Sequence, residues 1–193
     1  MRISGNFSNA LWSHKEKNMK LENKNIVILV EQQYQDLEVW YPYYRLKEEG
    51  AKVILAGTGS ANTYMGKFGV PAKVDFSIDE LKVKNHDAVL IPGGWAPDFL
   101  RRYETVIKFV QQMHKAGKLI ASICHGGWVL ASCGIIEKRT LTSFFAIKDD
   151  LINAGAKFVD KEVVVDKNLI TSRTPDDLPL FVFEIIKNLS RGK

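Results

Sequence analysis

A short apolar run followed at once by a turn and a helix constrains the fold of this chain most strongly. Residues 119–123 read Leu-Ile-Ala-Ser-Ile, a composition typical of a buried strand. Gly126 and Gly127 follow, and the apolar residues after them predict the start of a helix. Cys124 and His125 are therefore expected on a sharp turn between strand and helix, where side chains project from the end of the sheet.

Cys124 is the first candidate functional residue. Unpaired backbone N–H groups and the positive end of the following helix stabilise a thiolate, so we expect a lowered pKa for this thiol. The alternative is a small buried cysteine that contributes only packing. The position on the turn favours a functional thiol.

The remaining pattern alternates strands with helices. Apolar runs at residues 26–30, 51–56 and 88–91 predict buried strands, and residues 65–75 a short hairpin. Further strands are predicted over 141–144, 162–166 and 169–173, and helices over 36–50, 97–116, 147–154 and 178–189. In the first helix we expect four residues at helical spacing to face the core: Leu37, Trp40, Tyr41 and Tyr44. This alternation indicates a doubly wound α/β sandwich with ligands beyond the carboxyl ends of its strands.

Composition narrows the classes of function. The 193 residues suit one domain, predicted over 24–193, after a polar and loosely ordered extension over 1–23. No apolar run is long enough to cross a bilayer, and the first residues do not resemble a secretory signal. Two cysteines are too few for a disulfide framework. We therefore expect a cytoplasmic protein. The scattered lysines argue against nucleic acid, and no cofactor or metal site is expected.

Three strand ends bring candidate residues to one edge of the sheet. Glu38 lies beyond the first strand, and Gly94 ends the run Ile-Pro-Gly-Gly after the strand at 88–91. A cysteine, a histidine and a carboxylate form the generalised nucleophilic triad, and the N–H groups of Gly94 and His125 suit an oxyanion. The alternatives are a helix N-terminal acid for Glu38 and a surface histidine for His125.

Five segments resemble the ThiJ/PfpI superfamily, and within it the PfpI-type intracellular cysteine proteases. They are Asp36-Leu37-Glu38 with Tyr41-Pro42, residues 45–50, residues 91–97, residues 121–126, and residues 147–150 with 152–155. The resemblance runs from about residue 24 to 189. It implies a flavodoxin-like three-layer sandwich with a mostly parallel sheet and a nucleophile elbow, a fold similar to class I glutamine amidotransferases.

The resemblance also implies roles for individual residues. Cys124 matches the nucleophile, His125 the adjacent histidine, and Glu38 the acid that hydrogen-bonds the sulfur, which requires a protonated carboxyl when it faces a thiolate. Asp98 stands where these proteases have a glutamate that reaches the histidine of a neighbouring subunit. The chain is thus expected to assemble at least as a homodimer, with Asp98 acting across the interface.

Three positions depart from the family pattern. Gln35 replaces a glutamate, Phe144 replaces a tyrosine near the pocket, and Asp98 is one methylene shorter than glutamate. Each weakens the expectation of strong protease activity. Trp95 and Trp128 flank the two key turns, either as an aromatic wall over the thiol or as oligomer contacts.

Three functions are therefore expected. The first is a stress-related cysteine hydrolase of the intracellular peptidase type. The second uses the same residues as a glyoxalase or protein deglycase, on methylglyoxal or its adducts. The third is a non-catalytic stress protein, in which Cys124 senses redox state or the surface acts as a holdase. The expected ligand is a small carbonyl compound or a peptide, with neither nucleic acid nor membrane as partner.

Overall fold

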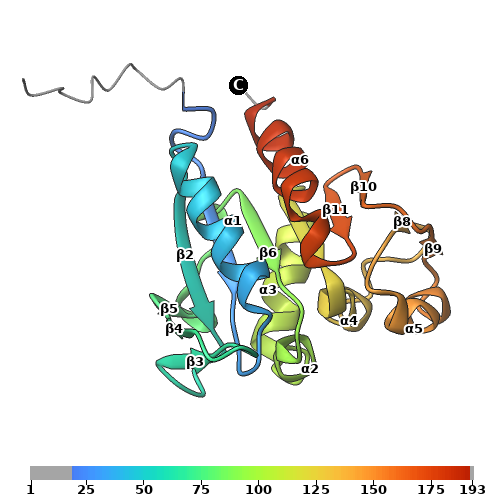
Figure 1. The fold of residues 1–193 in the computed structure, drawn as a ribbon, viewed down its shortest axis with the longest axis horizontal. Coiled ribbons are helices and arrows are strands. Elements are labelled where there is room, and N and C mark those ends of the chain that lie inside the picture. Colours follow the sequence, from blue (N-terminus) through green and yellow to red (C-terminus); the bar gives the residue numbers. More distant parts are fainter. Residues whose placement is uncertain (1–18, 192–193) are drawn as a thin grey trace, which may run out of the picture.

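A seven-stranded sheet forms the centre of the protein (Figure 1). The computed structural model describes residues 19–191. The sheet has the order β10-β11-β7-β6-β1-β2-β5, and every neighbouring pair is parallel except β10 with β11. The strands are β1 Asn25–Leu29, β2 Lys52–Gly57, β5 Phe76–Ser77, β6 Ala88–Ile91, β7 Leu119–Ile123, β10 Val163–Asp166 and β11 Leu169–Ser172. The predicted flavodoxin-like α/β sandwich is confirmed.

Helices cover both faces of this sheet. On one face α1 (Asp36–Glu48) and α6 (Leu178–Ser190) pack side by side, in front of the sheet in Figure 1. On the other face α3 (Glu104–Lys115) packs on β6 and β7, next to α4 (Gly127–Ser132), which also contacts α2 (Ala96–Leu100) and α5 (Lys148–Asn153). No helix within residues 19–191 has the length and apolarity needed to cross a bilayer.

Small elements complete the fold. Two-stranded sheets form from β3 (Thr63–Met65) with β4 (Pro71–Lys73) and from β8 (Thr140–Leu141) with β9 (Lys157–Phe158). The single turns of 3₁₀ helix are η1 Ile78–Glu80, η2 Val83–Asn85, η3 Cys124–Gly126, η4 Phe145–Ile147 and η5 Pro175–Asp177. The predicted hairpins near residues 65–75 and 162–173 are therefore present.

The core explains why the central strands are almost wholly apolar. Every residue of β6 and β7 is buried, and β1 is buried from Ile26 onward. Since helices cover both faces, side chains pointing in either direction leave water, which favours continuous β-branched runs over alternation. Leu21, which precedes the predicted start of the domain, is also fully buried. Residues 1–18 of the predicted extension lie outside the described residues.

Two predicted elements differ in extent. The helix expected over 97–116 is two helices, because the backbone of Tyr103 is extended at the start of α3. This change of direction lets Leu100 and Val106 both be fully buried. The strand expected over 141–144 is only β8, outside the central sheet, and Phe144 donates its N–H to the Cys124 carbonyl instead.

The predicted inner face of α1 is wrong. Leu37 is 57% exposed, Tyr41 39% and Tyr44 64%, and Trp40 is half-buried. The buried apolar side chains are instead Val39, Pro42 and Leu46, which are smaller than the aromatic rings and allow a closer approach to the sheet. The rings of Trp40, Tyr43 and Tyr44 pack on one another, and of the four predicted residues only Trp40 also contacts the edge of the core.

Replacing Leu90 by alanine tests the assignment of the core. Leu90 lies in β6 and is 1% exposed. Its truncation leaves a cavity between sheet and helices, so we expect the free energy of unfolding to fall by about 2–5 kcal/mol. Val165→Ala on the edge strand β10, where Val165 is 45% exposed, should cost less than about 1 kcal/mol. Urea denaturation measures both, and equal losses would contradict this layering.

Candidate active site

Cys124 occupies a strained turn at the carboxyl end of β7. The strand ends at Ile123, and Cys124 has a φ of 59°, in the left-handed region that side-chain-bearing residues rarely adopt. The residue is 8% exposed. Strain of this kind persists only where surrounding contacts hold it, and it clusters at functional sites.

Three segments meet at the Cys124 sulfur. His125 Nδ1 lies 3.2 Å from Sγ, and the backbone N–H groups of Gly94 and His125 hydrogen-bond the sulfur. Glu38, fully buried on α1, accepts a hydrogen bond from the Gly93 N–H through Oε2 at 2.6 Å. Its Oε1 is buried without a conventional partner in the described chain, and the carboxyl interacts with the Cys124 thiol. The structure thus brings Cys124, His125, Glu38 and Gly94 together.

Two glycines make this approach possible. A Cβ on Gly93 would lie 2.8 Å from both Cys124 Sγ and Glu38 Oε2. Gly94 has a φ of 73°, and a Cβ there would lie 2.3 Å from the Gln33 carbonyl oxygen. Neither position has room for a side chain, so the loop after β6 presents only backbone to the thiol.

Burial dominates the electrostatics of the pair. It raises the pKa of Glu38 to about 7, opposed by hydrogen bonds from Gly93 and Cys124 and by the charge of Lys67. Burial also raises the pKa of Cys124 to about 12, with a further increase from the Glu38 charge, although the N–H groups of Gly94 and His125 lower it. The predicted lowering of the thiol pKa is therefore wrong. A thiolate becomes favourable only when Glu38 is protonated and its O–H donates a hydrogen bond to the sulfur.

Aromatic rings surround the His125 imidazole. Its ring stacks on Phe144 with centroids 5.0 Å apart, and Trp128 meets it edge-on at 5.0 Å. Trp95 lies 6.0 Å from the imidazole and 6.2 Å from Trp128. Trp95 lines the thiol cavity, which favours the predicted aromatic wall for this residue, whereas Trp128 contacts the imidazole but does not line that cavity. Burial lowers the pKa of His125, so its ring is neutral at pH 7 and can accept a proton.

Sequence reasoning missed two residues of the site, Lys67 and Pro175, and the helix-capping role of Gln35. Gln35 caps α1 by accepting the Glu38 N–H through Oε1 at 3.0 Å, which fixes the backbone of the acid. Lys67 and Pro175 line the cavity beside the thiol, from the β3–β4 hairpin and from the start of η5. Lys67 is held by its N–H bond to the Tyr34 carbonyl, a contact between distant segments that no local motif announces.

Asp98 lies apart from this cluster within one chain. It is on α2 and forms an ion pair with Arg102. Across residues 19–191 no hydrogen bond or ion pair links it to His125. Its predicted role in a neighbouring subunit stays a prediction. Cys133, predicted to be a packed thiol, is free and buried.

The thiol opens into a small cavity of about 250 Å³. Its lining comprises Gln35, Glu38, Lys67, Gly94, Trp95, Cys124, His125, Phe144 and Pro175. Within the described part of the chain no three His, Cys, Asp or Glu side chains gather as a metal site. The arrangement combines a thiol, a neutral imidazole, a buried carboxyl and two backbone N–H groups, the types of group that nucleophilic catalysis at a carbonyl uses.

A strained cysteine at the carboxyl edge of a parallel sheet, backed by a buried acid, defines the class of α/β proteins with a nucleophile elbow. The chain belongs to the DJ-1/PfpI family, whose model matches residues 24–188.

Relatives of known name support this membership. Deglycase PH1704 of Pyrococcus horikoshii is 43% identical over 164 residues, 85% of this chain and 98% of that protein. Protein/nucleic acid deglycase 2 of Escherichia coli is 40% identical over 169 residues, which cover 86% of this chain and 98% of that protein. YraA of Bacillus subtilis, named as a candidate cysteine protease, is 38% identical over 82% of this chain and 94% of its own. The crystal structure of Drosophila melanogaster DJ-1beta superposes with a TM-score of 0.81 at 29% identity, covering 88% of this chain and 91% of that one.

Substituting Glu38 by glutamine tests its buried proton. The pKa of Glu38 is about 7 in the folded chain, against an ordinary value of 4.5. An acid with a raised folded pKa contributes stability that is complete below pH 4.5 and is lost as the pH rises through 7. The loss corresponds to about 3 kcal/mol by pH 8.

The measurement is urea denaturation at pH 5 and pH 8. Wild type should lose stability between these values, whereas Glu38→Gln, whose amide carries no charge, should lose markedly less. Glu104→Gln, at an exposed acid on α3, is the control and should behave as wild type. Equal pH dependence in wild type and Glu38→Gln would show that Glu38 does not bind the proton.

Proposed function

We propose that this chain is a cysteine-dependent hydrolase of small α-oxoaldehydes and of the adducts that they form with proteins. The observation that carries the proposal is the size of the cavity at Cys124, about 250 Å³ and bounded by aromatic rings. A three-carbon dicarbonyl fits within this volume, whereas a polypeptide substrate is too large for it. Relatives at 40–43% identity that bear the name deglycase support the same substrate class.

The residues suggest an order of proton and electron movements. In the molecules in which Glu38 is ionised, the Cys124 proton passes to its carboxylate. The sulfur attacks the aldehyde carbon of methylglyoxal, forming a C–S bond while the carbonyl electrons move to oxygen. The N–H groups of Gly94 and His125 stabilise that oxygen. Neutral His125 then removes the proton from the carbon bearing sulfur and returns it to the neighbouring carbon. The oxygen on the neighbouring carbon takes the proton held by Glu38, and the oxygen beside sulfur becomes a carbonyl again, which gives a lactoyl thioester.

Water completes the cycle. It adds to the thioester carbonyl, the C–S bond breaks, and lactate leaves while the thiol regains a proton. One carbon is oxidised and its neighbour reduced, so no external oxidant is consumed. For a protein adduct, the amine or thiol of the modified protein leaves when the aldehyde is transferred to Cys124.

A peptidase is the second candidate. A groove of about 550 Å³ shares Lys67 and Trp95 with the thiol cavity, and its other lining residues are Gln32, Gln33, Met65 and Gly66. An extended peptide lying in this groove would pass the thiol. The similarity to YraA favours the same reaction class.

Replacing Cys124 by serine separates these candidates. We expect lactate formation from methylglyoxal to fall by at least about 10³-fold, since the attacking sulfur is lost. His125→Gln should reduce it by about 10²–10⁴-fold through loss of the base. Cys133→Ala, at the other buried thiol, is the matched control and should retain activity.

The same variants are assayed with a fluorogenic peptide. Cleavage that requires Cys124, without lactate formation, would favour the peptidase. If neither activity depends on Cys124, the redox-sensing or holdase function is favoured instead. Mass spectrometry after treatment with mild peroxide would then show whether oxygen atoms are added to the Cys124 sulfur.

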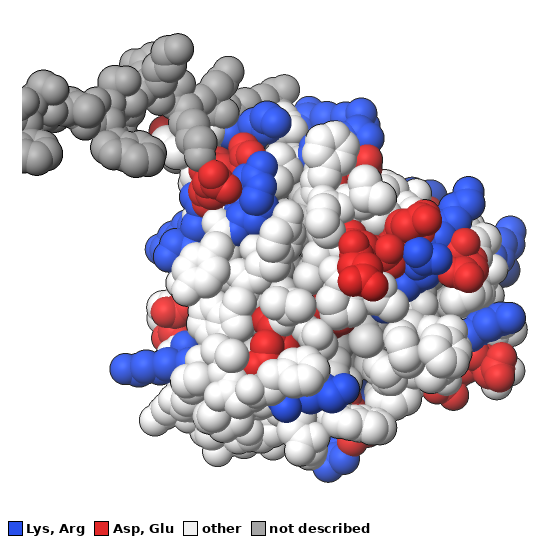
Figure 2. All heavy atoms as spheres, in the orientation of Figure 1, with Lys and Arg blue, Asp and Glu red and all other residues white. Residues whose placement is uncertain are grey.

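We infer that a second copy of the chain completes the site. Asp98, on α2, is partly exposed. The adjoining helices α1 and α6 separately expose large apolar side chains, namely Leu37, Tyr41, Tyr44, Leu180 and Phe183. Figure 2 shows an uncharged surface over this region, between clusters of Lys, Arg, Asp and Glu. Apolar patches of this kind mark interaction sites.

Mixing two inactive variants tests the contribution of Asp98. If Asp98 serves the His125 of another copy, Cys124→Ser and Asp98→Asn subunits complement each other. Dissociation and reassembly of a 1:1 mixture should restore about one quarter of wild-type activity, since half of the thiols survive and half of those face an intact Asp98. Each variant reassembled alone should stay inactive. An unchanged rate in Asp98→Asn itself, or no recovery on mixing, would contradict the role.

A further inference from the structure

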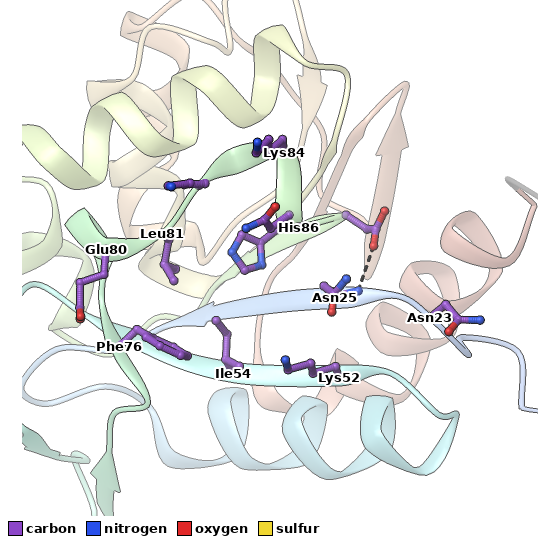
Figure 3. Close-up of a pocket in the computed structure, with 12 residues that line it drawn as sticks. Asn23, Asn25, Lys52, Ile54, Phe76, Glu80, Leu81, Lys84 and His86 are labelled. Carbon is purple, nitrogen blue, oxygen red and sulfur yellow. Dashed lines mark hydrogen bonds between the residues drawn. The ribbon is translucent and has the colours of Figure 1, made fainter.

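Figure 3 shows a second cavity, which is larger than the one at Cys124. Its volume is about 630 Å³. It is found where β1, β2 and β6 begin, and the segment containing η1 and η2 borders it. No residue lines both this cavity and the one at Cys124.

One part of the cavity is apolar. Ile54 of β2, Phe76 of β5 and Leu81 after η1 line it, and Figure 3 shows their side chains directed to the same space. Phe76 lies on β5 at the edge of the sheet and is 43% exposed, so part of its ring remains uncovered. Lys52 lies two residues before Ile54, so both side chains project from the same face of β2.

Another part carries unpaired positive charge. Lys52, Lys82 and Lys84 line the cavity, and none forms an ion pair with an acidic side chain of residues 19–191. The two acids at the cavity are already engaged. Glu80 accepts the Ser77 N–H at 2.7 Å, and Asp87 accepts the Asn25 N–H at 2.9 Å.

A buried polar atom lies between these two parts. His86 is 9% exposed, and its Nδ1 is buried with no hydrogen-bond partner in the described chain. Figure 3 shows the ring entering the cavity between Leu81 and Asn25. Burial lowers the pKa of His86, so the imidazole is neutral. Buried polar atoms nearly always have a partner, and an exception of this kind suggests an absent ligand or water.

We propose that this cavity binds a small organic anion, a carboxylate or a phosphate ester attached to an apolar body. The lysines meet the anionic group, the body covers Ile54, Phe76 and Leu81, and His86 Nδ1 gains a polar partner. The volume lies in the range of small-molecule sites, which combine apolar walls with a few polar groups. A simple inorganic ion would leave the apolar part uncovered. The site is independent of the reaction at Cys124.

Calorimetric titration with four probes tests both halves of the proposed ligand. Phenyl phosphate and benzoate carry an anion and a ring, inorganic phosphate carries only the anion, and benzyl alcohol only the ring. We expect at least one of the first two to bind at least 10-fold more tightly than either single-feature probe, and the stronger of them identifies the anion. Binding of inorganic phosphate as tight as that of phenyl phosphate, or no binding of any probe, would overturn the proposal.

Variants locate the binding. Lys52→Gln with Lys84→Gln should weaken the best probe at least 10-fold, whereas Lys115→Gln with Lys161→Gln, at exposed lysines outside both cavities, should not. His86→Phe keeps the ring that packs beside Phe109 but removes Nδ1, so we expect unchanged thermal stability with binding weakened about 2–10-fold. Cys124→Ser should bind as wild type. If Lys52→Gln with Lys84→Gln leaves binding unchanged, or if Cys124→Ser abolishes binding, the anion binds elsewhere and the proposal is wrong.

Discussion

The buried carboxyl of Glu38 is the interaction on which the site depends. It links α1 to the loop after β6 through Gly93 and faces the sulfur on the turn after β7. Since this acid is fully buried, its charge is unfavourable and its proton is retained to about pH 7. A neutral carboxyl attracts a thiolate, whereas an ionised one repels it. The protonation state of one buried acid therefore decides whether the sulfur is reactive.

Much of the fold follows from local sequence. The β-branched run at residues 26–30 and the run at 119–123 are β1 and β7, because a strand covered on both faces needs only apolar residues. Local pattern failed on α1, where Leu37 and Tyr44 have helical spacing but face outward. Periodicity identifies an apolar stripe without specifying which stripe meets the sheet. That choice depends on how closely Val39 and Leu46 can pack, which is a tertiary property.

The site was predictable where topology alone assembles it. Cys124 and Gly94 follow adjacent parallel strands, so their meeting follows from strand order. Lys67 was not predictable, because its hairpin is held by hydrogen bonds to residues about thirty positions earlier, including the Tyr34 carbonyl and the Asp36 carboxylate. The thiol pKa was mispredicted for a related reason. The turn supplies stabilising N–H groups, as expected, but desolvation depends on the surrounding side chains and outweighs them.

The stacking of His125 on Phe144 has a consequence for charge during turnover. An imidazole that accepts a proton becomes a cation 5.0 Å above an aromatic ring, and the electron-rich face of that ring attracts it, by about 0.5–1 kcal/mol or more. In a conventional triad a carboxylate supplies that compensation. Here the quadrupole of a phenyl group inside the same protomer supplies part of it, which makes the imidazolium less dependent on any anion from outside.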